Sequence, residues 1–254
     1  MSLDLALIGG TGLYRFPGLE DMRQLHVKTP FGDPSDRITR GRVGPRNVAF
    51  LARHGSEHTI APHRVNYRAN LWALHSLGAR SVIGINAVGG IRDDMGPRVL
   101  VVPEQIIDYT HGRLGSFCDI EGAKVEHVDF SEPYSADLRA ALVAAAARAK
   151  VAVVDGGCYG ATQGPRLETR AEIARMRRDG CDLVGMTGMP EASLARELGV
   201  DYACLALVAN WAAGCGDTTE ISLEEIFANL EHSTAQVPAI VFEMLGRDEA
   251  GNRG

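Results

Sequence analysis

The sequence has few cysteines, and they follow no regular pattern. None of the five forms a CxxC pair, and no secretory signal peptide precedes the first apolar segment. An odd, irregular set of this kind is typical of buried thiols rather than of a disulfide framework. We therefore expect a cytoplasmic protein with free cysteines. The five are Cys118, Cys158, Cys181, Cys204 and Cys215.

Excess positive charge and long apolar runs are also missing. The 254 residues carry 26 lysines and arginines against 32 aspartates and glutamates, a net charge of −6. This balance gives no electrostatic footprint for nucleic acid, although a local cluster of cations can still bind an anionic ligand. No apolar stretch is long enough to cross a bilayer. We therefore expect neither a nucleic acid nor a membrane as partner.

Two cofactor motifs are present only in incomplete form. Gly9-Gly10-Thr11-Gly12 follows an apolar segment, but the dinucleotide fingerprint needs a further glycine where Arg15 stands. Residues 54–58 have the spacing of an inverted zinc-protease motif, yet they contain Gly-Ser and follow a strand instead of lying on a helix. We therefore expect no nicotinamide cofactor and no metal. His58 and His63 are at least as well explained as hydrogen-bonded loop histidines.

Apolar segments typical of strands alternate with segments typical of helices. This alternation predicts a single α/β domain over residues 1–247, with a mostly parallel, mixed central sheet flanked by helices, and we expect residues 248–254 to be disordered. Pro238 should kink or break the last helix. Strands are predicted at 3–8, 47–52, 80–86, 99–102, 151–155, 183–185 and 202–209. Helices are predicted at 65–77 and 137–150 and after capping boxes at 169–172 and 222–225.

Small residues, hydroxyls and cations follow several of these strands. They occur at 9–12, 53–55, 86–90, 164–166 and 185–187. Because an open α/β sheet binds ligands at the carboxyl ends of its strands, we expect the loops to form one anion and small-molecule site. Taken singly, some members have plain alternatives: Met186 as core, Thr187 as a helix cap, and Asn210 as a satisfied loop amide.

The chain resembles the trimeric purine nucleoside phosphorylases, and most of all their methylthioadenosine phosphorylase branch. The resemblance covers nearly the whole chain. It rests most specifically on Arg53-His54-Gly55, Gly164-Pro165-Arg166 with Glu172, and Val184-Gly185-Met186-Thr187 with Pro190-Glu191-Ala192. It implies a homotrimer that cleaves an N-ribosidic bond with inorganic phosphate as co-substrate and no cofactor. Phosphate attacks C1′, and a purine leaves.

The resemblance also implies roles for individual residues. His54 and Asn210 would be catalytic, with Asn210 contacting purine N7 and Met186 lying under the ribose. The phosphate positions correspond to Thr11, Arg53, His54, Asn86, the backbone N–H of Ala87, and Thr187.

The base loop departs from the adenosine-type pattern. Such enzymes carry two aspartates where this chain has Asn210 and Ala212, and serine where it has Glu168. Asparagine can donate to N7 and to a 6-oxo oxygen, glutamate can accept from N1–H, and alanine accepts nothing from a 6-amino group. These differences favour a 6-oxopurine. Leu167 replaces a phenylalanine that stacks on the base.

The predicted pocket for the 5′ substituent is apolar. Leu223 stands where inosine and guanosine phosphorylases have a histidine, with Ile226 and Phe227 nearby, and His127 matches a residue lent by the neighbouring subunit. The resemblance therefore implies 5′-methylthioinosine as substrate, with hypoxanthine and 5-methylthioribose 1-phosphate as products. The alternatives are a methylthioadenosine phosphorylase, an inosine/guanosine phosphorylase and a non-catalytic nucleoside-binding protein.

Overall fold

Two long apolar strands, β5 (Ser81–Gly90) and β11 (Asp201–Trp211), pair in parallel at the centre of the sheet. Both are buried along most of their length, as strands covered on both faces are. β1 (Leu5–Gly9) pairs in parallel with β5 and with β4 (Arg46–Ala52). The computed structural model describes residues 2–120, 122–216 and 221–246. The expected domain boundary at 247 and the expected disordered tail at 248–254 lie outside these residues.

Within the described part of the chain, the remaining strands extend this centre into a sheet of eleven strands. Six of the ten strand pairings among the described residues are parallel and four are antiparallel, which confirms the predicted mostly parallel, mixed sheet. These strands are β2 (Glu20–Leu25), β3 (Ile38–Val43), β6 (Leu100–Val102), β7 (Gln105–Asp108), β8 (Val153–Asp155), β9 (Cys158–Ala161) and β10 (Leu183–Gly185).

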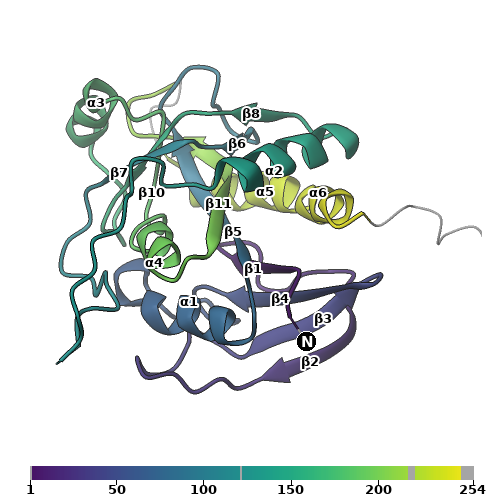
Figure 1. Cartoon of the computed structure of the whole chain (residues 1–254). Helices are drawn as coiled ribbons and strands as arrows, with labels where there is room; N and C mark the ends of the chain where they lie inside the picture. Colours follow the sequence, from purple (N-terminus) through teal and green to yellow (C-terminus); the bar gives the residue numbers. More distant parts are fainter. Residues whose placement is uncertain (1, 121, 217–220, 247–254) are drawn as a thin grey trace, which may run out of the picture.

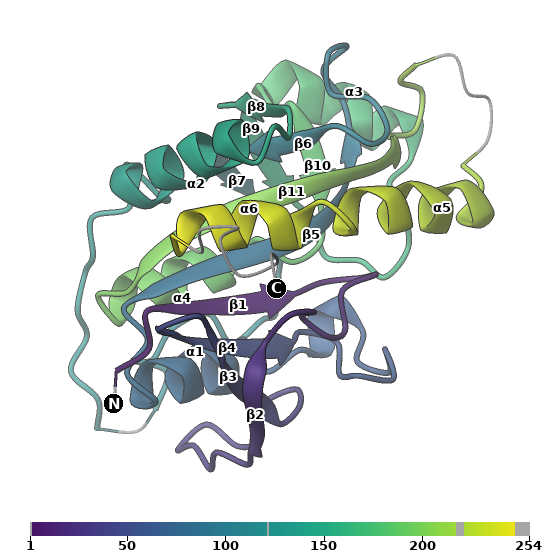
Figure 2. The same cartoon turned by 90° about the vertical axis from the view of Figure 1, so that its right-hand side faces the viewer.

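Helices cover both faces of the sheet (Figures 1 and 2). On one face, α1 (Tyr67–Ser76) and α4 (Glu191–Glu197) pack on side chains such as Ile8 and Val82. On the other, α2 (Ala136–Arg148), α5 (Leu223–Thr234) and α6 (Val237–Met244) pack on residues that include Leu7 and Leu205. A smaller cluster seats α3 (Arg170–Asp179) against the end of β11. Among the described residues, no helix combines the length and hydrophobicity needed to span a bilayer.

The helix ends follow the chemistry of their capping residues. Thr169 and Glu172 form the predicted reciprocal capping box of α3, and the Ser222 side chain accepts from the Glu225 N–H at the start of α5. The expected last helix is two helices, because α5 ends at Thr234 and α6 begins at Val237. Pro238 lies in the first turn of α6, where a missing N–H leaves no hydrogen bond unmade.

Candidate active site

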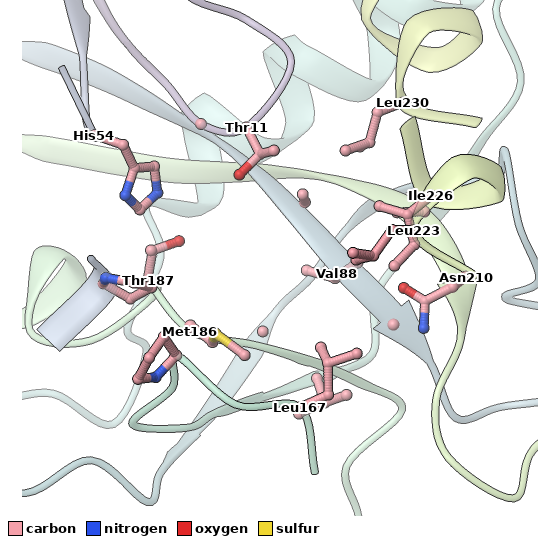
Figure 3. Close-up of a pocket in the computed structure, with 18 of the residues that line it drawn as sticks. Thr11, His54, Val88, Leu167, Met186, Thr187, Asn210, Leu223, Ile226 and Leu230 are labelled. Carbon is pink, nitrogen blue, oxygen red and sulfur yellow. The ribbon is translucent and has the colours of Figure 1, made fainter. Parts of the chain in front are cut away.

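A cavity of about 460 Å³ opens where β1, β4, β10 and β11 end, and β5 contributes to its wall. Its volume is in the range of small-molecule sites. Thirteen of the fifteen predicted site residues lie on its wall; Asn86 and His127 do not. Figure 3 shows Thr11, His54 and Thr187 pointing into one part of the cavity, with Leu223 and Ile226 across from them. The cavity therefore has a polar end and an apolar end.

Arg53 is the fully buried cation of the polar end. Its Nε and Nη2 donate to the Glu191 carboxylate at 2.8–2.9 Å, and Nη2 also reaches Asn86 Oδ1 at 3.3 Å. Nη1 donates to the Ile85 carbonyl at 2.9 Å. A guanidinium has five N–H groups, so these bonds leave a single one, on Nη1. As far as the described residues go, Arg53 therefore has one free N–H for the cavity that it lines.

Glycine at position 10 leaves room for the Arg53 guanidinium. A Cβ on Gly10 would come within 2.9 Å of Arg53 Nη1 and 2.6 Å of the Ile85 carbonyl oxygen, so a larger residue would crowd both atoms. Burial opposes the charge of Arg53, but the Glu191 carboxylate outweighs burial, so the pKa of Arg53 lies above its ordinary value. Arg53 thus stays protonated, with Glu191 as its counter-ion.

Asn86 lies beneath the wall and does not line the cavity. Its side chain is fully buried, its Nδ2 donates to Thr187 Oγ1 at 2.8 Å, and its Oδ1 accepts from Arg53. The sequence predicted a direct phosphate contact, but this placement directs the amide toward two other predicted phosphate ligands. Because one side chain joins both, Asn86 fixes their spacing.

His54 is held as a neutral imidazole at the same end. Its Nδ1 lies 2.8 Å from the Ile60 carbonyl oxygen, which can only accept, so Nδ1 carries the proton and Nε2 is an acceptor. Burial, reinforced by the positive charge of Arg53, lowers the pKa of His54 to about 4. At neutral pH His54 therefore offers a lone pair that can accept from a hydroxyl of phosphate or of a sugar.

The part of the cavity predicted to hold the base, which we call the base end, contains the three departures from the adenosine-type pattern noted in the sequence. The half-buried Glu168 accepts a hydrogen bond from Thr162 Oγ1 at 2.6 Å. Asn210 Nδ2 donates to the Trp211 carbonyl at 2.6 Å, and no other described residue bonds its second amide hydrogen or its Oδ1, so both can reach a ligand. The buried Ala212 places a methyl group on the wall. This end offers a carboxylate and an amide, but no acceptor at position 212.

The apolar end of the cavity is formed by the first turns of α5. Leu223, Ile226 and Phe227 line it together with Ile221 and Leu230, and all five side chains are apolar. Leu223 is 67% exposed and Phe227 56% exposed, so this end is open to the outside. An apolar substituent would be better accommodated here than a hydroxyl.

His127 lies apart from this cavity. It is exposed, and residues 112–120 and 122–133 contain no helix or strand. The structure of one chain does not bring it to the site.

Sequence reasoning missed part of the wall. His58 and residues 59–62 follow the His54 loop and line the cavity, and the His58 ring lies 4.9 Å from the His54 ring. Thr162 and Glu191 were not proposed either, although Thr162 donates a hydrogen bond to Glu168 and Glu191 accepts one from Arg53. The Gly-Ser sequence after His54, which marks a turn back over the site, was the one available signal for the first group.

Comparisons with known proteins agree with this geometry. A model of the phosphorylase superfamily matches residues 4–246. A probable S-methyl-5′-thioinosine phosphorylase of Xanthomonas campestris is 57% identical, with 96% of this chain and 97% of that protein covered. An S-methyl-5′-thioadenosine phosphorylase of Mycolicibacterium smegmatis is 46% identical, with coverages of 95% and 90%.

A solved structure shows the same fold. Methylthioadenosine phosphorylase from Schistosoma mansoni in complex with adenine superimposes with a TM-score of 0.91, at 31% identity, covering 98% of this chain and 93% of that one. A family match over nearly all residues and relatives of this similarity lead to one conclusion: the chain belongs to the phosphorylase superfamily, a family of enzymes.

Proposed function

We propose that this protein cleaves 5′-methylthioinosine with inorganic phosphate, giving hypoxanthine and 5-methylthioribose 1-phosphate. The observation that carries the proposal is the pairing, in one cavity, of a base end with Glu168 but no acceptor at Ala212 and an apolar 5′ end. The names of close relatives, four of them probable S-methyl-5′-thioinosine phosphorylases at 52–57% identity, support the same substrate.

The polar end supplies what a phosphate nucleophile needs. The single free N–H of Arg53, the hydroxyls of Thr11 and Thr187 and the N–H of Ala87 donate to phosphate oxygens, and neutral His54 accepts from a phosphate hydroxyl. Asn86 acts through Thr187 and Arg53, in place of the direct contact that we first expected. Donors fixed in advance lower the barrier because they need no rearrangement during the reaction.

The reaction places opposite charges at the sugar and at the base. A phosphate oxygen attacks C1′ while the C1′–N9 bond breaks, and the bonding electrons go to the purine. The anionic phosphate stabilises the cationic sugar above Met186, while Asn210 donates to N7 and Glu168 accepts from N1–H. Leu167 covers the base. These groups supply the required charges, so our proposal includes no metal and no organic cofactor.

The experiment that tests this proposal is release of base with and without phosphate, using methylthioinosine, methylthioadenosine, inosine and guanosine. Phosphate-dependent release, fastest from methylthioinosine, is the expected result. Release that does not depend on phosphate would make the protein a hydrolase, and no release from any nucleoside would make it a binding protein.

The 5′ preference gives a specific prediction. Leu223→His should shift preference from methylthioinosine toward inosine, because the variant loses apolar contact with the S-methyl group and gains a donor for a 5′-hydroxyl. Losing such contact lowers discrimination by about 1–3 kcal/mol, or roughly tenfold and more. The measurement is the ratio of kcat/KM for the two nucleosides, with Leu223→Met as an apolar control. An unchanged ratio in Leu223→His would remove this residue from the 5′ pocket.

We also propose a homotrimer in which His127 reaches the 5′ end of a neighbouring site. Exposed apolar side chains on the same stretch, Leu114, Val125 and Val128, support contact with another subunit. We expect sedimentation to give three times the chain mass, and His127→Ala to raise KM for methylthioinosine without changing KM for phosphate. A fully active monomer would contradict this.

The five unpaired cysteines among the described residues support a reducing, cytoplasmic location.

A further inference from the structure

Glu168, the residue that would recognise a 6-oxopurine, lies between two hollows. Besides the cavity described above, it lines a second one of about 690 Å³, which Arg166 and Arg175 also line. Glu168 lies in the segment before α3 that has neither helix nor strand. On this second side Arg166 donates to the Glu172 carboxylate at 2.7 and 2.9 Å and not to Glu168. A carboxylate in this position needs a fixed partner if it is to face the base.

Thr162 is that partner, and it is rigidly placed. It is buried directly after β9, its N–H donates to the Gly185 carbonyl at 2.8 Å, and its own carbonyl accepts from Arg113 Nη2 at 3.1 Å. Its hydroxyl lies 2.6 Å from Glu168 Oε1 and 3.3 Å from the Gly185 carbonyl. A hydroxyl has one proton to donate, and the shorter contact takes it.

We infer that Thr162 is a positioning residue for base specificity, which selects 6-oxopurines over 6-aminopurines through its hydrogen bond to Glu168. The inference rests on the proposed function. With Oε1 held by Thr162, the other carboxylate oxygen is left to accept from N1–H of a 6-oxopurine. A 6-aminopurine has a lone pair at N1, so the fixed carboxylate repels it. Without the threonine hydroxyl, Oε1 loses its partner and Glu168 can turn toward the second hollow, so both effects weaken.

The test compares Thr162→Val, which removes the hydroxyl at nearly constant volume, with Thr162→Ser, which keeps it. We expect Thr162→Val to lower the kcat/KM ratio of methylthioinosine to methylthioadenosine by roughly tenfold, the range for one hydrogen bond to a charged group. Thr162→Ser should restore most of the ratio. KM for phosphate should stay the same in both variants, since Thr162 does not line the polar end.

A double-mutant cycle keeps the inference testable if Thr162→Val folds poorly. Thr162→Ala should lower the ratio in the wild-type background but leave it unchanged in a Glu168→Ala background, which has no acceptor for Thr162, because the proposed effect acts through the Glu168 carboxylate. Equal effects in the two backgrounds, or a wild-type ratio in Thr162→Val, would overturn the role of Thr162. Wild-type protein that does not prefer methylthioinosine would instead overturn the proposed function, so the two failures are distinguishable.

Discussion

Glu191→Gln is expected to lower the free energy of unfolding by about 3–5 kcal/mol and to remove most of the phosphorolytic activity. Arg53 and Glu191 are both almost completely buried, and their charged atoms lie 2.8 Å apart. Glutamine keeps the size of the side chain but leaves the guanidinium with an uncompensated buried charge. It also puts a donor in place of one of the two carboxylate oxygens that accept from Arg53, so the free Nη1 hydrogen is no longer held in a fixed direction.

Two further variants separate stability from catalysis in this experiment. Glu231→Gln, which makes the same change on the exposed face of α5, should leave both properties unchanged. Arg53→Met combined with Glu191→Leu removes both charges, so it should recover part of the lost stability while remaining inactive. The measurements are denaturant unfolding and kcat/KM for phosphate. If Glu191→Gln unfolds within about 0.5 kcal/mol of wild type, the ion pair does not support the site as we describe it.

Asn210→Asp combined with Ala212→Asp is expected to raise activity on methylthioadenosine relative to methylthioinosine by roughly tenfold or more. The 6-amino group of adenine has no acceptor at position 212 in the wild-type cavity, and an unpaired buried donor costs about 1–3 kcal/mol. A carboxylate at 212 supplies the acceptor, while one at 210 can donate to N7 when protonated. Glu168 still favours a protonated N1, so we do not expect a complete reversal.

The control for this pair of changes is Asn210→Asp combined with Ala212→Leu. It fills position 212 without adding an acceptor, so it should not improve methylthioadenosine. Both double variants are compared with wild type by the ratio of kcat/KM for the two nucleosides. If the leucine variant shifts the ratio as much as the aspartate variant, the change arises from altered shape, and the role assigned to position 212 is wrong.

Strands that are buried on both faces were predictable, because burial requires an almost continuous run of apolar residues. β1, β4, β5 and β11 are continuous apolar runs, and each was predicted to within a few residues. β2 was not predicted, because its residues are mostly polar and exposed and it becomes a strand by antiparallel pairing with β3. Such edge strands depend on partners that the local sequence does not reveal.

The wall of the cavity was more predictable than the residues behind it. Loops that follow buried strands meet at one edge, so Thr11, His54 and Thr187 could be placed together from the order of the strands. Glu191 bonds Arg53 across 138 positions of sequence, and no spacing rule joins two residues so far apart. Asn86 was predicted to contact the ligand because its position in the sequence does not show whether its side chain points into the cavity or behind the wall.

The central claim is a phosphorylase selective for a 6-oxopurine with a methylthio sugar. Its most direct test is the wild-type kcat/KM for methylthioinosine and for methylthioadenosine at saturating phosphate, with a phosphate-free control. We expect methylthioinosine to be preferred by at least about tenfold, the value of one unpaired buried donor, and no turnover without phosphate. A preference for methylthioadenosine, or equal turnover in the absence of phosphate, would contradict the account.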